Sequence, residues 1–190
     1  MNNVKAIETK YNGYRFRSRL EARWAVFFST AQISYEYELE GFTMPSGTAY
    51  LPDFYLPEFD VYVEIKPSQR IPLLELKKLQ EFAIEGDNNL LLIVGTPTQE
   101  DMLLIKDTWN LDEIEADFGI EGGDEDIVDF FLNWLKEHNT VTFGRTPLSE
   151  VEGWQLVYRN GGKYPLINQA LSQAKEARFE HGESGNHKQK

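Results

Sequence analysis

Two hydrophobic periods divide the first half of the chain into helices and strands. Between residues 16 and 31, apolar side chains recur every three or four positions and fall within an arc of about 120° on a helical wheel. Between residues 61 and 66, apolar side chains occupy every second position, which is the period of a strand with one buried face. These patterns predict an amphipathic helix over residues 16–31 and a strand over residues 61–66.

The same patterns predict the remaining elements of this half. Alternation predicts strands over residues 34–39 and 50–56, and helical periodicity predicts a second amphipathic helix over residues 71–84. Residues 89–95 form a continuous apolar run, which is typical of a central strand buried on both faces. The predicted order is therefore helix, three strands, helix and strand, and the fold class is α/β.

Residues 50–56 and 61–66 are predicted to form a hairpin, because turn-forming residues lie between them. If the tip of the turn lies between Glu58 and Phe59, Asp53 lies opposite Glu64. Their side chains then share one face, with Cβ atoms about 5 Å apart. A register shifted by one residue would place the two carboxylates on opposite faces, so this pairing depends on the turn.

Asp53, Glu64 and Lys66 are the candidate catalytic residues of this hairpin. Two carboxylates held that close repel each other, and both remain ionised when a cation lies between them. Oxygen ligands favour a hard divalent ion, so the pair predicts a site for Mg²⁺ or Mn²⁺. Lys66 lies on the same face, where it could orient an attacking water or neutralise a phosphate. The trio therefore predicts hydrolysis of phosphodiester bonds.

Glu21 is a third candidate carboxylate. On the predicted helix it lies just outside the apolar arc, where a side chain can reach across to a neighbouring strand and its metal. The alternative is a local ion pair with Arg17, four residues earlier, which would stabilise the helix by roughly 0.2–0.5 kcal/mol.

The segment Leu51-Pro52-Asp53, followed by Val63-Glu64-Ile65-Lys66, resembles the signature of the PD-(D/E)XK nuclease superfamily. Residues 16–25, FRSRLEARWA, resemble the first helix of small phage-type members, in which a glutamate completes the acidic site. The resemblance covers residues 13–95. It implies a restriction-endonuclease-like α-β-β-β-α-β core, with a mixed central sheet flanked by helices.

The resemblance also implies roles for the candidate residues. Asp53, Glu64 and the backbone carbonyl of Ile65 would bind the metal. Glu21 would bind it through water or complete a second position, and Lys66 would activate the attacking water. The implied protein is a metal-dependent endodeoxyribonuclease that acts on DNA with Mg²⁺ or Mn²⁺. A homodimer is expected where both strands are cut, because one such site cuts one strand.

Charge is distributed unevenly along the chain, whose formal net charge is −12. Residues 1–23 contain six basic and two acidic side chains, a net charge of +4, and the remainder carries −16. Because phosphate contacts dominate affinity for nucleic acids, a nucleic-acid surface should be local. The candidate phosphate-binding residues are Arg15, Arg17, Arg19, Arg23, Lys77 and Lys78.

The second half is predicted to add elements but little chemistry. We expect helices over residues 99–109, 127–137 and 166–179, and short strands near residues 141–143 and 154–158. Residues 111–129 contain nine acidic and no basic side chains, without the ligand spacing of a calcium loop, so we expect a solvated acidic surface. The expected organisation is a basic, extended arm (1–15) with a turn at Asn12-Gly13, a nuclease-like core (16–96), C-terminal additions packed on the core (97–180) and a disordered tail (181–190).

Several protein classes are excluded by what the sequence lacks. It contains no cysteine, hence no disulfide or thiolate metal site, and its three histidines are too scattered for a zinc site. Neither a Walker motif nor a nucleophile elbow is present. No apolar stretch of about 18 residues and no signal peptide occurs, so we expect no membrane association. The expected location is the cytoplasm, which for a phage-encoded protein is that of the host.

Two alternatives to an active nuclease stay open. The chain could be a binding or regulatory protein that keeps this fold, with a nucleic-acid or protein partner and little or no cleavage, as its acidity suggests. Asp53, Glu64 and Lys66 could also form an ordinary ion-pair cluster on the sheet, which contributes at most about 1 kcal/mol. The positions of the carboxylates distinguish an ion-pair cluster on the sheet from a metal site, because a metal site requires the carboxylates to converge on one small pocket.

Overall fold

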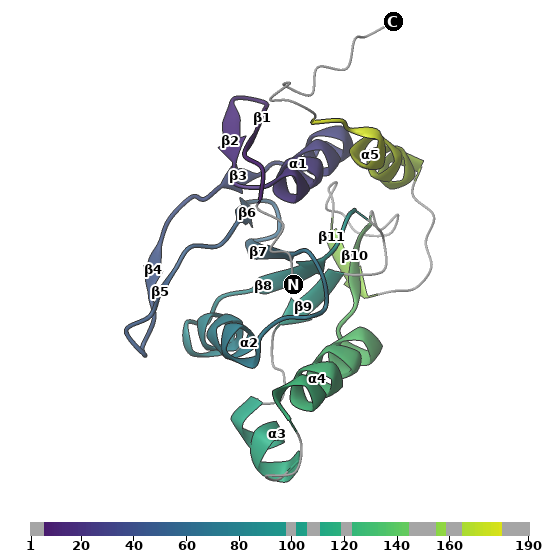
Figure 1. The fold of residues 1–190 in the computed structure, drawn as a ribbon. Helices are drawn as coiled ribbons and strands as arrows, with labels where there is room; N and C mark the ends of the chain where they lie inside the picture. The colour runs from purple at the N-terminus through teal and green to yellow at the C-terminus, as the bar shows by residue number, and fades with distance from the viewer. Residues whose placement is uncertain are drawn as a thin grey trace, which may run out of the picture.

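A five-stranded mixed sheet forms the centre of the protein (Figure 1). The computed structural model describes residues 6–97, 102–105, 111–118, 123–144, 155–158 and 165–179. The strands lie in the order β3 (Glu36–Tyr37), β6 (Phe54–Leu56), β7 (Val61–Lys66), β8 (Leu90–Val94) and β9 (Met102–Ile105). β7 and β8 pair in parallel, and the other neighbours in this sheet pair antiparallel. The predicted α/β class is confirmed.

Helices cover both faces of this sheet (Figure 1). On one face α1 (Arg19–Ala31) packs against α5 (Pro165–Glu176). The other face carries α2 (Leu73–Gln80), its π-helical extension η1 (Glu81–Glu85) and α4 (Asp124–His138), beside which lies α3 (Leu111–Phe118).

Strand β8 serves both hydrophobic cores. Leu91 and Ile93 belong to the core under α1 and α5, whereas Leu90 and Leu92 belong to the core under α2 and α4. Successive side chains of a strand point to opposite faces, so a strand covered on both sides must be apolar at every position. The prediction of a central strand buried on both faces is confirmed.

The first helix begins three residues later than predicted. Ser18 is its N-cap, because its side chain accepts a hydrogen bond from an amide of the first turn at 3.1 Å. Phe16 belongs instead to β2 (Tyr14–Phe16), although it is fully buried as the helical wheel required. The rest of the predicted apolar arc is confirmed, since Trp24 and Phe27 expose no surface.

A tight hairpin precedes α1. Strands β1 (Thr9–Tyr11) and β2 pair antiparallel, and the predicted turn at Asn12-Gly13 joins them. Both turn residues have positive φ, 48° and 86°, as a two-residue turn of type I′ requires. The expected extended lead-in is therefore a hairpin from Thr9 onward, and residues 1–5 lie outside the described residues.

The strand predicted over residues 50–56 is interrupted at Pro52 and Asp53. Its beginning belongs to β5 (Ala49–Tyr50), which pairs with β4 (Phe42–Thr43) in a separate hairpin. The strand resumes as β6, and the proline between them has no amide hydrogen for a ladder. The bend that the proline predicted at Asp53 is confirmed.

Strand β9 corrects one prediction. Residues 102–105, predicted within a helix over residues 99–109, form a strand that pairs antiparallel with β8. Four apolar residues fit either element by periodicity, and burial of Met102 and Ile105 beside β8 decides in favour of the strand. Residues 98–101 and 106–110 lie outside the described residues.

The C-terminal additions pack on the core. α3 buries Leu111 and Ile114 but exposes Asp112 and Glu113, so the described side chains here form the expected solvated acidic surface. α4 begins at Asp124, three residues before its predicted start, because acidic residues favour a first helical turn. β10 (Val141–Gly144) pairs with β11 (Gln155–Tyr158). Within the described ranges, every helix is too short or too polar to span a membrane.

Replacing the buried Leu92 by alanine should destabilise the protein by about 2–5 kcal/mol, because the cavity left in a two-sided strand cannot collapse easily. The matched control is Leu74→Ala on α2, where 80% of the side chain is exposed and a change below about 0.5 kcal/mol is expected. Urea unfolding followed by circular dichroism measures both. Equal losses in the two variants would contradict the layered arrangement.

Candidate active site

The predicted carboxylates and lysine line one cavity of about 480 Å³. Glu21 comes from α1, Asp53 from the bend before β6, and Glu64 and Lys66 from β7. The three carboxylic residues are only 8%, 6% and 7% exposed. Side chains from three separate elements therefore converge as the sequence predicted, and an ordinary surface ion-pair cluster does not describe them.

The hairpin register that the turn predicted is confirmed. Phe54 lies opposite Val63, Tyr55 opposite Tyr62 and Leu56 opposite Val61. Continued by one residue, this register places Asp53 opposite Glu64. Asp53 is held in this position by its own side chain, because its Oδ2 accepts a hydrogen bond from the Ile65 amide at 2.8 Å.

The cavity disfavours the charged form of Asp53. Burial raises the pKa of its carboxyl well above the ordinary value, and the negative charges of Glu64 and Glu21 raise it further. The amide of Ile65 and the guanidinium of Arg17, 3.3 Å from Oδ1, oppose that shift without cancelling it. A divalent cation beside this carboxylate would relieve both the burial and the repulsion.

Glu21 is held by three donors at the start of α1. The Ser18 hydroxyl donates to Oε1 at 2.6 Å, and the Tyr37 hydroxyl and Arg17 amide donate to Oε2 at 2.6 Å and 3.1 Å. The Arg17 guanidinium instead contacts Glu38 and Asp53. The alternative prediction, a local side-chain ion pair between Glu21 and Arg17, is therefore wrong. The carboxylate of Glu21 is oriented by donors that lie outside residues 19–31 of α1.

Lys66 bridges two carboxylates. Its Nζ donates to Oε1 of Glu64 and to Oε1 of Glu75, each at 2.7 Å. Burial alone would lower the pKa of Lys66, but its two carboxylate partners outweigh burial and raise it. The side chain is therefore a charged donor at neutral pH, which suits it to orient a water or a phosphate oxygen.

The chemistry of the donors fits a hard divalent ion, although the carboxylates do not form a ready chelate. Within the described part of the chain, no group of three acidic, histidine or cysteine side chains is arranged to hold a metal by itself. A metal held by Asp53 and Glu64 would therefore complete its coordination with backbone oxygen and water, which is usual for Mg²⁺. The buried, mutually repelling carboxyl groups are the observation that supports such an ion.

Helix α2 and strand β5 add site residues that the sequence did not reveal. Glu75 accepts hydrogen bonds from Lys66 and, at 2.8 Å, from Lys78; burial would raise the pKa of Glu75, but these cations lower it. The Tyr50 hydroxyl donates to Oε2 of Glu64 at 2.8 Å. The three-residue spacing of Glu75 and Lys78 places both on one helical face, but only the fold shows that this face meets β7.

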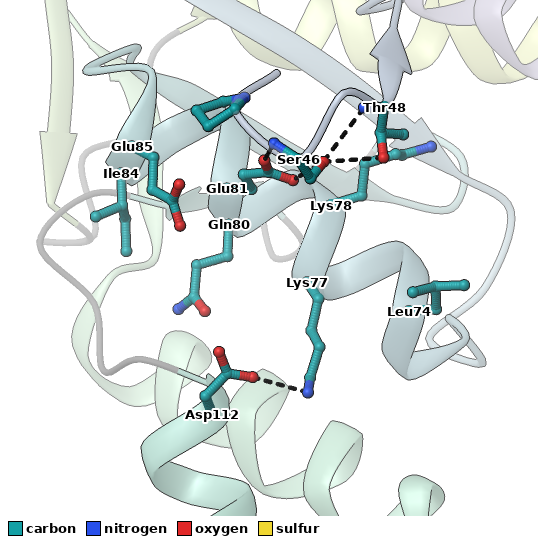
Figure 2. Close-up of a pocket in the computed structure, with 11 residues that line it drawn as sticks. Ser46, Thr48, Leu74, Lys77, Lys78, Gln80, Glu81, Ile84, Glu85 and Asp112 are labelled. Carbon is teal, nitrogen blue, oxygen red and sulfur yellow. Dashed lines mark hydrogen bonds and ion pairs between the residues drawn. The ribbon is translucent and has the colours of Figure 1, made fainter. Parts of the chain in front are cut away.

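The candidate phosphate-binding residues do not all reach the cavity. Arg17 and Lys78 line it, and the side chain of Lys78 is half-buried. Lys77 lies outside it and pairs with Asp112 at 2.8 Å (Figure 2). Of the other three, Arg15 pairs with Glu8, and neither Arg19 nor Arg23 is among the described residues that line the cavity.

Asp53→Asn should raise the stability of the metal-free protein. Because the pKa of Asp53 is raised in the folded state, its ionisation costs stability, and this cost grows as pH rises from the ordinary pKa near 3.8. We expect the difference in Tm between variant and parent to be small near pH 4 and to increase toward pH 8 in EDTA. Each kcal/mol corresponds to about 2–4 °C for a chain of this size.

Thermal unfolding with Mn²⁺ provides the complementary measurement. The ion should raise the Tm of the parent and leave that of Asp53→Asn nearly unchanged, because an amide is a poorer ligand than a carboxylate. A Tm difference that shrinks as pH rises would contradict the raised pKa. Equal stabilisation of both proteins by Mn²⁺ would place the ion elsewhere.

Comparison with protein-family models, with curated proteins and with solved structures finds no match to this chain.

Proposed function

We propose that this protein is a metal-dependent nuclease of the PD-(D/E)XK type, which hydrolyses phosphodiester bonds of DNA. One observation carries the proposal: Glu21, Asp53 and Glu64, three buried carboxylic residues from separate elements, line one cavity together with Lys66. The succession of α1, β3, β6, β7, α2 and β8 around a mixed sheet supports a restriction-endonuclease-like core. The β4–β5 hairpin is inserted into that succession.

Asp53 and Glu64 would hold Mg²⁺ or Mn²⁺, together with the backbone carbonyl of Ile65, and Glu21 would join through water. When bound, such an ion neutralises charge on the phosphoryl oxygens and lowers the pKa of a coordinated water. The protein's contribution is to keep these oxygen ligands buried and fixed. Tyr50 fixes Glu64, and the Ile65 amide fixes Asp53.

Lys66 would orient the water that attacks phosphorus. Its ammonium group lies 2.7 Å from Glu64, so a donor is already placed beside a proposed metal ligand. Glu75 accepts a second hydrogen bond from the same group at 2.7 Å, which limits the positions that Nζ can take. Arg17 and Lys78 line the cavity as cations and would bind the phosphate oxygens next to the scissile bond.

A protein of this fold that binds without cutting is the second candidate. It is favoured by the contact between Lys66 and Glu64, which already neutralise each other without a substrate, and by the net charge of −12. Its partner would be a nucleic acid or another protein. Cleavage assays separate it from the enzyme, because a binding protein needs neither the metal nor the charge of Lys66.

In an assay with plasmid and with single-stranded DNA, at least one of the two should be cleaved with Mg²⁺ or Mn²⁺ and left intact in EDTA. Lys66→Ala and Asp53→Ala should each lower the rate by about 100-fold or more, since one removes the orienting donor and the other a metal ligand. Lys175→Ala, on the exposed face of α5, is the control and should keep full activity. Cleavage that survives both site substitutions would come from a contaminant, and a mobility shift without cleavage would favour the second candidate.

Glu75 should act as a positioning residue for Lys66. We expect Glu75→Ala to lower kcat by about tenfold or more, because Lys66 loses the partner that positions it, and to raise KM by a smaller factor, because Lys78 loses the same partner. Glu75→Gln keeps an acceptor oxygen and should recover part of the loss. Glu137→Gln on α4 is the matched control, and an equal effect on KM and kcat would show instead that Glu75 contributes to substrate binding.

A further inference from the structure

Figure 2 shows a second cavity, whose volume is about 650 Å³. It lies between the β4–β5 hairpin and the helix formed by α2 and η1. Lys78 lines both cavities. Along the hairpin, residues 49–51 line the carboxylate cavity and Ser46 and Thr48 line the second one, so the two cavities follow each other along one groove.

The walls of the second cavity are held in place before any ligand binds. The amide and the hydroxyl of Ser46 both donate to the carboxylate of Glu81, at 2.6 Å and 2.9 Å. The ring of Phe42 packs edge-on against that of Phe82, with centroids 5.0 Å apart. The hairpin is therefore attached to η1 at two places, and binding would not require it to become ordered.

Exposed apolar side chains gather along this groove. In the described residues the exposed large apolar side chains are Ile7, Leu39, Leu51, Leu74 and Ile84. Leu74 and Ile84 line the second cavity, and Leu51 lines the carboxylate cavity. Leu74 is 80% exposed in the first turn of α2, and Ile84 is 42% exposed near the end of η1, so the helical wall of the second cavity offers a ligand an apolar side chain at each end (Figure 2).

Charge indicates which part of a nucleotide the second cavity can accept. Its lining includes Glu81, Glu85 and Asp112 against Lys77 and Lys78, and Lys77 already pairs with Asp112. This lining repels a phosphate. Its carboxylate and hydroxyl oxygens can instead accept hydrogen bonds from the amino groups of a base.

Lys78 marks the border where a phosphate fits best. Its Nζ is held by Glu75 at 2.8 Å and lies 5.3 Å from the centre of the Tyr50 ring. A phosphate at this lysine would lie between the carboxylate cavity, where the chemistry is proposed, and the second cavity with its apolar and hydrogen-bonding lining. The nucleoside attached to that phosphate would then enter the second cavity.

We propose that the second cavity binds one unpaired nucleoside of the substrate strand, adjacent to the scissile phosphate. This inference rests on the proposed nuclease function and names its substrate class, a single strand or a frayed end. The volume is that of a site for one small ligand, and a base can use such a lining only when its edges are not engaged with a complementary strand. A duplex interior would leave the second cavity empty.

The test compares a single-stranded oligonucleotide with bis(4-nitrophenyl) phosphate, a small diester that has no nucleoside for the second cavity. Leu74→Glu and Ile84→Glu should each lower the ratio of kcat/KM for the oligonucleotide to that for the small diester by tenfold or more. Leu39→Glu adds the same charge at an exposed leucine outside both cavities and should keep the ratio of the parent. The parent should also cleave the single strand at least tenfold faster than the blunt duplex of the same sequence.

An unchanged ratio in Leu74→Glu and Ile84→Glu, or equal cleavage of duplex and single strand, would overturn the inference and leave the nuclease proposal intact. If the parent hydrolyses neither substrate, the nuclease proposal fails. Fluorescence anisotropy of the labelled oligonucleotide then tests whether the second cavity binds a nucleotide. Weaker binding by Leu74→Glu than by Leu39→Glu would still support a nucleotide site. Absence of oligonucleotide binding by the parent would end both proposals, and would leave a protein partner as the occupant to be sought.

Discussion

The hydrogen bond from the Ile65 amide to the carboxylate of Asp53 is the interaction on which the site depends. Pro52 cannot donate to a ladder, so the backbone pairing of the hairpin stops at Phe54. One position further, the carboxylate of Asp53 accepts a hydrogen bond from the Ile65 amide at 2.8 Å, and this bond attaches the bend to β7. One contact thus fixes the register beyond the end of β6 and brings the carboxylate of Asp53 toward that of Glu64.

The cost of this arrangement is electrostatic. Burial and two neighbouring carboxyl groups disfavour the charged form of Asp53, and the surrounding donors satisfy it only in part. A fold selected for stability alone would place an amide or an apolar side chain there. The conflict is confined to a few side chains, because Lys66 neutralises charge beside Glu64, and Ser18 and Tyr37 donate hydrogen bonds to Glu21.

The sequence was informative where local geometry determines the structure. A short turn and strict alternation sufficed for the pairing of β6 with β7, and a continuous apolar run sufficed for the two-sided burial of β8. The sequence was insufficient where tertiary packing determines the structure. Four apolar residues became the strand β9 rather than a helix because an edge of the sheet was open to them. Glu75 and Tyr50 entered the site through the packing of α2 and of an inserted hairpin, neither of which a single-sequence pattern reports.

The π-helical turn η1 links the β4–β5 hairpin to β7. Phe82, within that wide turn, packs its ring against Phe42 at 5.0 Å, Tyr50 at 4.8 Å and Tyr62 at 5.3 Å. In an α-helix each residue turns the chain by about 100°, so deleting one residue of α2 ahead of Phe82 would rotate its side chain by about that angle around the axis. The ring of Phe82 would leave its three aromatic neighbours, and Tyr50 would lose the support that aims its hydroxyl at Glu64. A length change in this helix would therefore act as a change in the orientation of Glu64, a proposed metal ligand.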